Sequence, residues 1–154
     1  MSALNDKVVV ITGGSSGIGH AAALDFARGG ARVLVTGRRR ALLDEVAALH
    51  SNIEGLVADV AVPEDASRTI AAAVKKWGRL DVLVNNAGAG AILPLAEATD
   101  AAIANILAVN VVGPSLLTTA ALPYLGAAKG AVINVSSTFG QKSGAGLSHY
   151  AASK

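Results

Sequence analysis

The stretch Val8-Val9-Val10-Ile11-Thr12-Gly13-Gly14-Ser15-Ser16-Gly17-Ile18-Gly19 decides the fold, because a β-branched run leads through a glycine-rich turn into an alanine-rich helical segment. Glycines at positions 13, 17 and 19 let the backbone turn tightly and approach a pyrophosphate. The helix that follows offers N–H donors and a favourable dipole at its start. The spacing departs from the common G-x-G-x-x-G fingerprint, and an ordinary glycine-rich turn is the alternative. The order of strand, loop and helix favours a dinucleotide-binding site.

The rest of the chain continues the alternation of short apolar runs and helical segments. We expect strands at 7–12, 31–36, 53–58, 80–85 and 131–136, and helices at 17–28, 39–50, 63–76 and 100–125, the last bending near Gly113-Pro114. Each strand is a continuous apolar run, which suits a parallel sheet covered on both faces. The order predicts a single domain, 1–154, with a doubly wound, Rossmann-like α/β sheet and right-handed crossovers.

Composition excludes several classes of protein. Hydrophobic residues make up 52% of the chain and charged residues 16%, against about 25% charged in an average protein. The chain has no cysteine, and its three histidines show no ligand spacing, so we expect no metal site. A net charge of +2 argues against a nucleic-acid partner. No apolar run reaches the roughly 18 residues of a membrane span, and no secretion signal is evident, so we expect a cytoplasmic protein with no membrane partner.

A second motif lies where the second expected strand ends, at Val35-Thr36-Gly37-Arg38. In a nucleotide-binding sheet, a carboxylate at this point would accept hydrogen bonds from the ribose 2′-hydroxyl of NAD. This chain has Gly37 instead, followed by Arg38, which can bind a 2′-phosphate. We therefore expect NADP, with NAD as the alternative. Ser16 stands where a second basic residue would strengthen the case, and arginines at a helix start can form a solvated face.

The third group of residues is Asn85-Asn86-Ala87-Gly88, Asn110, Ser136-Ser137, Tyr150 and Lys154. In a helix, Tyr150 and Lys154 stand one turn apart on one face. A lysine ammonium favours the phenolate form of a neighbouring tyrosine and so makes it usable for proton transfer near neutral pH. Hydride transfer leaves charge on an oxygen, where donors and a cation are useful. Taken singly, Asn110 could satisfy backbone at a bend, Ser137 could be a turn residue, Tyr150 an interface aromatic and Lys154 a solvated end.

Together these residues resemble the short-chain dehydrogenase/reductase family, with its T-G-x-x-x-G-I-G loop, N-N-A-G segment and Y-x-x-x-K pair. The similarity covers nearly the whole chain. The separation of Ser137 from Tyr150 suits the family's catalytic serine better than that of Ser136. The resemblance implies an NADP(H)-dependent oxidoreductase that transfers a hydride between the nicotinamide and a carbonyl or secondary alcohol.

The resemblance also implies a role for each matching residue. Tyr150 would be the acid or base, Lys154 would assist it and hold the nicotinamide ribose, Ser137 would bind the substrate oxygen, and Asn110 would anchor a water in a proton relay. The expected cofactor contacts are Gly13, Ser15, Ser16, Gly17, Ile18, Gly19, Arg38, Asp59, Val60, Asn85, Ala87, Gly88, Tyr150 and Lys154. The segments 89–95 and 138–147 would border the substrate, and their small or apolar residues indicate a largely apolar pocket.

The chain departs from the family at its end, since members continue past the lysine and add further strands, which are missing here. A last strand at 131–135 would then be an exposed apolar edge that invites pairing with another chain, and we expect a homo-oligomer. From Ser148 to Lys154 there are only seven residues, fewer than the roughly 12–15 that an isolated helix needs, so a chain end here would leave Lys154 on a fraying last turn. The alternative is that the sequence is a fragment of a longer natural protein. The alternative to an enzyme is a non-catalytic dinucleotide-binding fragment or partner subunit.

Overall fold

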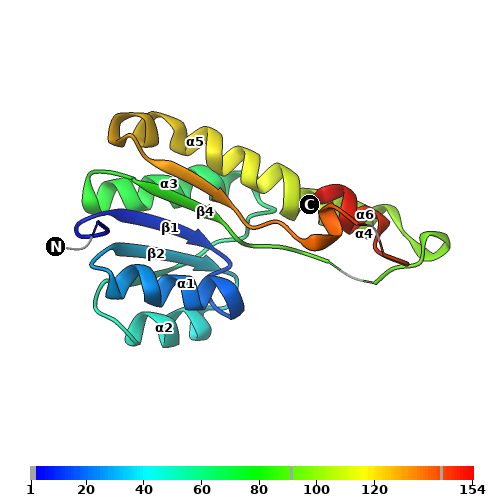
Figure 1. Cartoon of the computed structure of the whole chain (residues 1–154), viewed down its shortest axis with the longest axis horizontal. Helices are drawn as coiled ribbons and strands as arrows, with labels where there is room; N and C mark the ends of the chain where they lie inside the picture. Colours follow the sequence, from blue (N-terminus) through cyan, green and yellow to red (C-terminus); the bar gives the residue numbers. More distant parts are fainter. Residues whose placement is uncertain (1–2, 91, 143) are drawn as a thin grey trace.

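The computed structural model describes residues 3–90, 92–142 and 144–154. Across these ranges, five parallel strands form one sheet in the order β3-β2-β1-β4-β5 (Figure 1). The strands are β1 (Val8–Thr12), β2 (Arg32–Gly37), β3 (Ile53–Val57), β4 (Val82–Asn85) and β5 (Ala131–Asn134). The structure thus confirms the doubly wound, Rossmann-like α/β fold, with strand ends within two residues of those expected.

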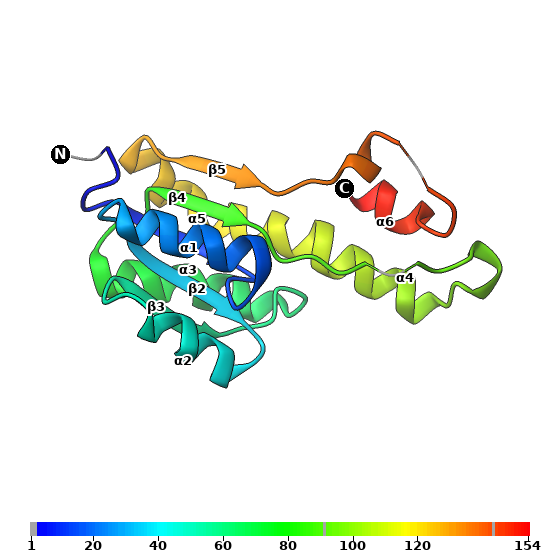
Figure 2. The ribbon, with the colours of Figure 1, turned by 60° about the horizontal axis from the view of Figure 1, so that its bottom comes forward.

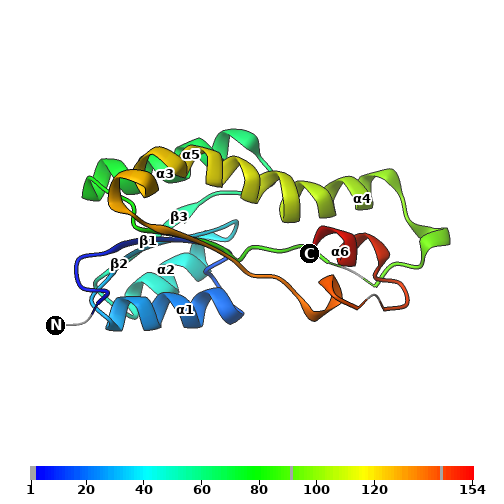
Figure 3. The ribbon, with the colours of Figure 1, turned by 45° about the horizontal axis from the view of Figure 1, so that its top comes forward.

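Helices cover both faces of the sheet. Figure 3 shows α3 (Pro63–Trp77), α4 (Asp100–Leu107) and α5 (Gly113–Ala128) on one side and α1 (Gly17–Arg28) and α2 (Arg40–Ala48) on the other. The short elements η1 (Leu95–Glu97), η3 (Thr138–Gly140) and α6 (Ser148–Ser153) lie beyond the carboxyl ends of β4 and β5 (Figure 2). The site residues after those strands are therefore brought to one end of the molecule.

The alternation of side chains along β1 explains why the strands read as continuous apolar runs. Val8 and Val10 belong to the core cluster beneath α3 and α5, whereas Val9 and Ile11 belong to the cluster beneath α1 and α2. All four side chains are fully buried. A central parallel strand has no solvent face, so every position must be apolar.

A buried carboxylate fixes the opposite, amino-terminal edge of the sheet. Asp81 accepts hydrogen bonds from the backbone N–H of Val8 at 3.0 Å, from Lys7 Nζ at 3.0 Å and from the Arg79 guanidinium at 2.6 and 2.8 Å. Burial alone would raise the pKa of the Asp81 carboxyl, but the hydrogen bonds from Arg79, Val8 and Lys7 outweigh it and hold that pKa below its usual range. Asp81 therefore stays ionised in the folded protein at neutral pH.

The long helix after β4 is continuous rather than bent at Gly113-Pro114. The π-helical turn η2 (Ala108–Val112) joins α4 to α5 and absorbs the irregularity that the sequence placed one residue later. By length and composition alone, the run Asp100–Ala128 is apolar enough to cross a membrane, which the sequence analysis did not anticipate. A single such helix is weak evidence, and here Leu117, Ala121 and Leu125 are buried in the core against α3 and the sheet.

Strand β5 is an edge of the sheet, as expected. Among the described strands it pairs only with β4, and the side chain of Ile133 is 44% exposed. Whether this edge pairs with another chain stays a prediction.

Candidate active site

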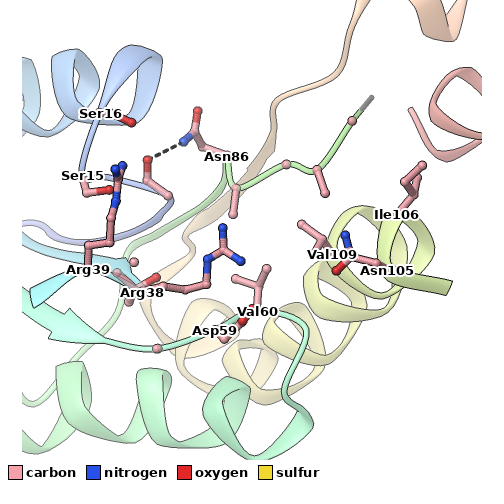
Figure 4. Close-up of a pocket in the computed structure, with 18 of the residues that line it drawn as sticks. Ser15, Ser16, Arg38, Arg39, Asp59, Val60, Asn86, Asn105, Ile106 and Val109 are labelled. Atoms are coloured by element: carbon pink, nitrogen blue, oxygen red, sulfur yellow. Dashed lines mark hydrogen bonds between the residues drawn. The ribbon is translucent and has the colours of Figure 1, made fainter. Parts of the chain in front are cut away.

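A cavity of about 960 Å³ lies at the carboxyl ends of the central strands (Figure 4). In the sheet, β1 lies between β2 and β4. The connection from β1 to β2 runs through α1 on one face of the sheet, and the connection into β4 runs through α3 on the other face (Figure 3). Doubly wound sheets bind ligands in the crevice at such a point. Several of the residues expected to contact a cofactor line this cavity: Gly13, Ser15, Ser16, Arg38, Asp59, Val60, Ala87 and Gly88. Gly17 and Gly19 stand at the start of α1, with φ = +56° at Gly17, and do not line it.

The glycine loop is locked against the end of β4. Gly13 has φ = +66°, and a Cβ there would lie 2.9 Å from Ala87 Cα, so glycine is required for both conformation and space. The side chain of Asn86 donates to the carbonyl oxygens of Thr12 at 2.9 Å and Gly13 at 3.1 Å. In return, Thr12 Oγ1 accepts from the backbone N–H groups of Asn86 and Ala87, both at 3.1 Å. Loop and strand end therefore form one rigid wall of the cavity.

The side chains of the neighbouring residues Asn85 and Asn86 point in different directions. Asn85 is buried and donates to Asn134 Oδ1 at 2.9 Å and to Thr118 Oγ1 at 3.3 Å, so its side chain points away from the cavity that Asn86 lines. Within the segment 85–88, which was expected to line the cofactor, Asn85 does not line this cavity and Asn86 does. The alternation of side chains at the end of a strand is the signal that distinguishes them.

The end of β2 presents arginines to the cavity and no carboxylate. Arg38 and Arg39 both line it, and Figure 4 shows their guanidinium groups turned toward the space beneath the glycine loop. A Cβ at Gly37 would lie 3.3 Å from Ser15 Oγ, so the Ser15 hydroxyl stands close to where an acidic side chain would otherwise begin. Arg39, for which no role in cofactor binding was expected from the sequence, is a second cation at this end.

The loop between β3 and α3 forms the far wall, with Asp59 and Val60. Asp65, in the first turn of α3, accepts from the backbone N–H of Asp59 at 2.7 Å and from the Arg68 guanidinium at 2.6 and 3.0 Å. The bond from Asp59, and then that from Arg68, hold the pKa of the Asp65 carboxyl below its usual range. Val62 at the N-cap of α3 has no side-chain cap, so Asp65 reaches back to order the loop instead.

One face of the helical run after β4 completes this cavity, and the sequence analysis missed it. Its lining residues Ala102, Asn105, Ile106 and Val109 follow the i, i+3, i+4, i+7 spacing of a single helix face. The spacing of these residues in the sequence could therefore have identified this wall of the cavity.

A second cavity, of about 560 Å³, adjoins the first and shares Asn86, Gly88, Ala89 and Gly90 with it. Its lining brings together three of the four expected catalytic residues, Ser137, Tyr150 and Lys154, with Ile18 at its rim. The Tyr150 ring packs against Gly90, where a Cβ would lie 2.7 Å from Cδ2. Ser137 Oγ accepts from the backbone N–H of Phe139 at 3.2 Å and keeps its own hydrogen to donate.

Lys154 is held by the end of β5. Its Nζ donates to the Val135 carbonyl oxygen at 3.1 Å, and Ser136 Oγ donates to the Lys154 carbonyl oxygen at 2.9 Å. A Cβ at Gly88 would lie 3.3 Å from Lys154 Nζ, so the ammonium reaches the segment that both cavities share. Both serines line the second cavity with Tyr150, and Ser136 in addition positions the lysine.

The fourth expected catalytic residue, Asn110, lies in η2 behind these groups. It lines a third cavity of about 410 Å³ together with Ser153 and Lys154. Ala91 and Ser143, which fall in the segments expected to border a substrate, lie outside the described residues. In the described ranges, no three His, Cys, Asp or Glu side chains gather as metal ligands.

The sequence model of the short chain dehydrogenase family matches residues 7–154. The chain belongs to this family. An uncharacterized oxidoreductase of Mycobacterium tuberculosis is 39% identical across 100% of the chain and 61% of its own length. A short-chain dehydrogenase from Streptomyces avermitilis superposes with a TM-score of 0.92 at 38% identity, over 97% of this chain and 56% of that one. A metagenomic short-chain oxidoreductase in complex with NADP gives a TM-score of 0.90 at 38% identity, over 99% of this chain and 71% of that one.

The chain spans only part of the length of the curated relatives it matches, 61% of the mycobacterial protein and 45% of a 38% identical 11-beta-hydroxysteroid dehydrogenase from Arabidopsis thaliana. The matched part includes the glycine loop and the Y-x-x-x-K pair.

Proposed function

We propose that this protein is an NADP(H)-dependent oxidoreductase that transfers a hydride between the nicotinamide and a carbonyl or secondary alcohol. The observation that carries the proposal is the shared wall of the two cavities: Gly88, Ala89 and Gly90 border both the dinucleotide-sized cavity and the one lined by Ser137, Tyr150 and Lys154. A dinucleotide lying in the first cavity would reach the second with its nicotinamide end.

The residues of the first cavity fit a dinucleotide with a 2′-phosphate. Gly13 leaves a cradle that a Cβ would fill, and the start of α1 offers backbone N–H groups to the pyrophosphate. Asp59 and Val60 would border the adenine, and Arg38, with Arg39 beside it, would bind the 2′-phosphate. NADP in the complex of the 38% identical metagenomic oxidoreductase supports this choice over NAD.

In the proposed reaction, a bound nicotinamide would supply or accept the hydride at the substrate carbon. Tyr150 would donate a proton to the carbonyl oxygen during reduction and remove one from the alcohol during oxidation. Lys154 would hold the nicotinamide ribose, and the free hydrogen of Ser137 would bind the substrate oxygen and fix its direction.

The second cavity favours an uncharged, largely apolar substrate. Ile92, Phe139 and Leu147 line it, and Lys154 is the single charged residue among its described lining residues. Assembly through the exposed edge β5 and a cytoplasmic location are further parts of this proposal.

Adding NADPH to the purified chain tests the proposal. We expect a rise in melting temperature, since a ligand that binds only the folded state stabilises it, and oxidation of NADPH in the presence of small hydrophobic ketones. The alternative is a non-catalytic dinucleotide-binding chain, which would keep the glycine loop without turning over a substrate. Binding without turnover across the ketone panel would select that alternative, and no binding would refute both.

A further inference from the structure

Contacts with other elements fix the helix that carries Tyr150. The structure describes all six residues of α6, and none of them is fully buried. Its N-cap, Leu147, makes no side-chain cap. Neither burial within α6 nor a cap holds this turn, so contacts with other elements help to fix it.

Ser153, the residue before Lys154, makes one such contact with a neighbouring element. Its Oγ donates to the Tyr150 carbonyl oxygen at 2.7 Å and accepts from Asn110 Nδ2 at 2.8 Å. One hydroxyl therefore links the backbone of Tyr150 to the π-helical turn η2.

Asn110 passes this link on to the wall of the cofactor cavity. Its Oδ1 accepts from the backbone N–H of Ala89 at 2.8 Å, and its Nδ2 donates to the carbonyl oxygen of the same residue at 2.8 Å. Both amide hydrogens are then used, one on Ala89 and one on Ser153. A relay water near Asn110 would have to use the remaining lone pair of Oδ1 or a different group.

We propose that Ser153 is a positioning residue, whose hydroxyl holds the Tyr150–Lys154 pair at a fixed distance from the cofactor-cavity wall through Asn110 and Ala89. The inference rests on the proposed function for its catalytic consequence. The bonds at Ser153 and Asn110 are short, and the side chains are partly buried, so water competes with them only in part. The hydrogen bonds between Lys154 and the residues after β5, at Val135 and Ser136, hold the end of α6 and do not reach the Tyr150 backbone.

The test compares Ser153→Ala and Ser153→Thr with the control Ser148→Ala in the full chain. Ser148 belongs to the same helix and is exposed. Because Ser153→Ala loosens the geometry of the proton donor, we expect kcat with NADPH and a ketone to fall about ten- to a hundredfold. The KM for NADPH should stay within about twofold, since the cavity that binds most of the cofactor is unchanged. Ser153→Thr keeps the hydroxyl and should recover most of the rate, while Ser148→Ala should match the unmodified protein.

Hydrogen exchange provides a readout that does not need turnover. The Ala89 N–H is protected by Asn110, so Ser153→Ala should speed its exchange and that of the α6 amides, with no change at β1 and none in Ser148→Ala. Unchanged exchange at Ala89, or equal losses of kcat in Ser153→Ala and Ser148→Ala, would overturn the proposal. If the unmodified chain shows no turnover, the proposed function fails, and the exchange rates still decide whether Ser153 positions α6.

Discussion

The two ends of the active site are built on different foundations. The glycine-loop end rests on β1, whose residues Val8, Val9, Val10 and Ile11 are each 0% exposed, and on a loop that cannot accept a Cβ at Gly13. The Tyr150 end rests on α6, η3 and the edge strand β5, where Phe139 is 41% and Ile133 44% exposed. Core packing sets the geometry of the first end, and a few side-chain hydrogen bonds set that of the second. Substitutions at the two ends should therefore separate cofactor binding from chemistry.

The largest effect should come from Tyr150→Phe. The change removes the proposed proton donor but keeps the ring that packs on Gly90, so kcat should fall about 10²- to 10⁴-fold. NADPH affinity should hardly change, because the glycine-loop end is untouched. Steady-state rates and a fluorescence titration with NADPH measure the two quantities, with Tyr124→Phe on the exposed face of α5 as the control. Turnover that survives in Tyr150→Phe would remove the proposed mechanism.

The next largest effect should fall on stability, at the amino-terminal edge of the sheet, opposite the active site. Asp81→Asn leaves the bonds from Lys7 and Arg79 without their negative charge. The Asp81 side chain is 3% exposed but its partners are 38% and 47% exposed, so we expect a loss of about 2–4 kcal/mol in the free energy of unfolding, less than for a wholly buried pair. Urea unfolding followed by the single tryptophan, Trp77, measures it.

The pH dependence of that loss has a definite sign. The folded state lowers the pKa of Asp81, so its stabilising contribution is fully present above the unfolded value of about 3.9 and disappears as the pH falls through the folded pKa. The gap between the unmodified protein and Asp81→Asn should accordingly close below about pH 4. Asp44→Asn, at an exposed ion pair with Arg40, should cost less than about 0.5 kcal/mol at any pH. A gap that persists undiminished in acid would show that shape, and not charge, holds this edge.

Arg38→Ala should break the glycine-loop end selectively. Loss of a charge-assisted hydrogen bond to a 2′-phosphate is worth about 1.5–3 kcal/mol, so the Kd for NADPH should rise about ten- to a hundredfold. The Kd for NADH should stay the same, because NADH has no 2′-phosphate. Arg40→Ala is the matched control, since Arg40 pairs with Asp44 on the surface and does not line the cavity. Equal losses for NADPH and NADH would indicate a general electrostatic effect and remove the argument for NADP.

The contrast between the two ends also decides what the sequence could reveal. The strands and the glycine loop could be predicted because a buried parallel strand must be apolar at every position, as β1 is, and because a tight turn must contain glycine, as at Gly13. The members of the Tyr150 end could be named from their spacing and from family resemblance. Their support could not, because Ser153 and Asn110 meet across long sequence separations through single hydrogen bonds that leave no periodic pattern.

Two details of the fold show the same limit. The sequence placed a bend at Gly113-Pro114, since proline disturbs a helix, but the irregularity is the π-helical turn before it, where Asn110 turns to Ala89. The expected cofactor contact Asn85 lies at the end of β4 as expected, but its side chain is buried and does not line the cofactor cavity. In both cases the hydrophobic pattern identifies the element but not where a helix becomes irregular or which way a side chain at the end of a strand points.

The smallest expected effect concerns the far wall of the cofactor cavity. It tests whether this wall depends on a polar contact, as the Tyr150 end depends on side-chain hydrogen bonds. Asp65→Asn keeps an oxygen for the Asp59 N–H but loses the ion pair with Arg68, so the loop carrying Asp59 and Val60 should become looser. We expect the Kd for NADPH to rise about two- to fivefold, in line with about 0.5–1 kcal/mol for a partly exposed pair. Glu64→Gln, the adjacent acid in the same first turn, is the control.

Acid sharpens this last test, because the folded protein lowers the pKa of Asp65. The contribution of its carboxylate is complete above the unfolded pKa of about 3.9 and is lost only as the pH falls through the folded value. NADPH affinity should therefore differ between the unmodified protein and Asp65→Asn by a constant factor from pH 8 to about pH 5. A factor that already shrinks between pH 7 and pH 6 would mean that a different group orders the loop. Equal NADPH affinity in Asp65→Asn and the unmodified protein at every pH would instead place the far wall with the core-packed end of the site, since the side chains of α3 that bury against the sheet would hold it without help from Asp65.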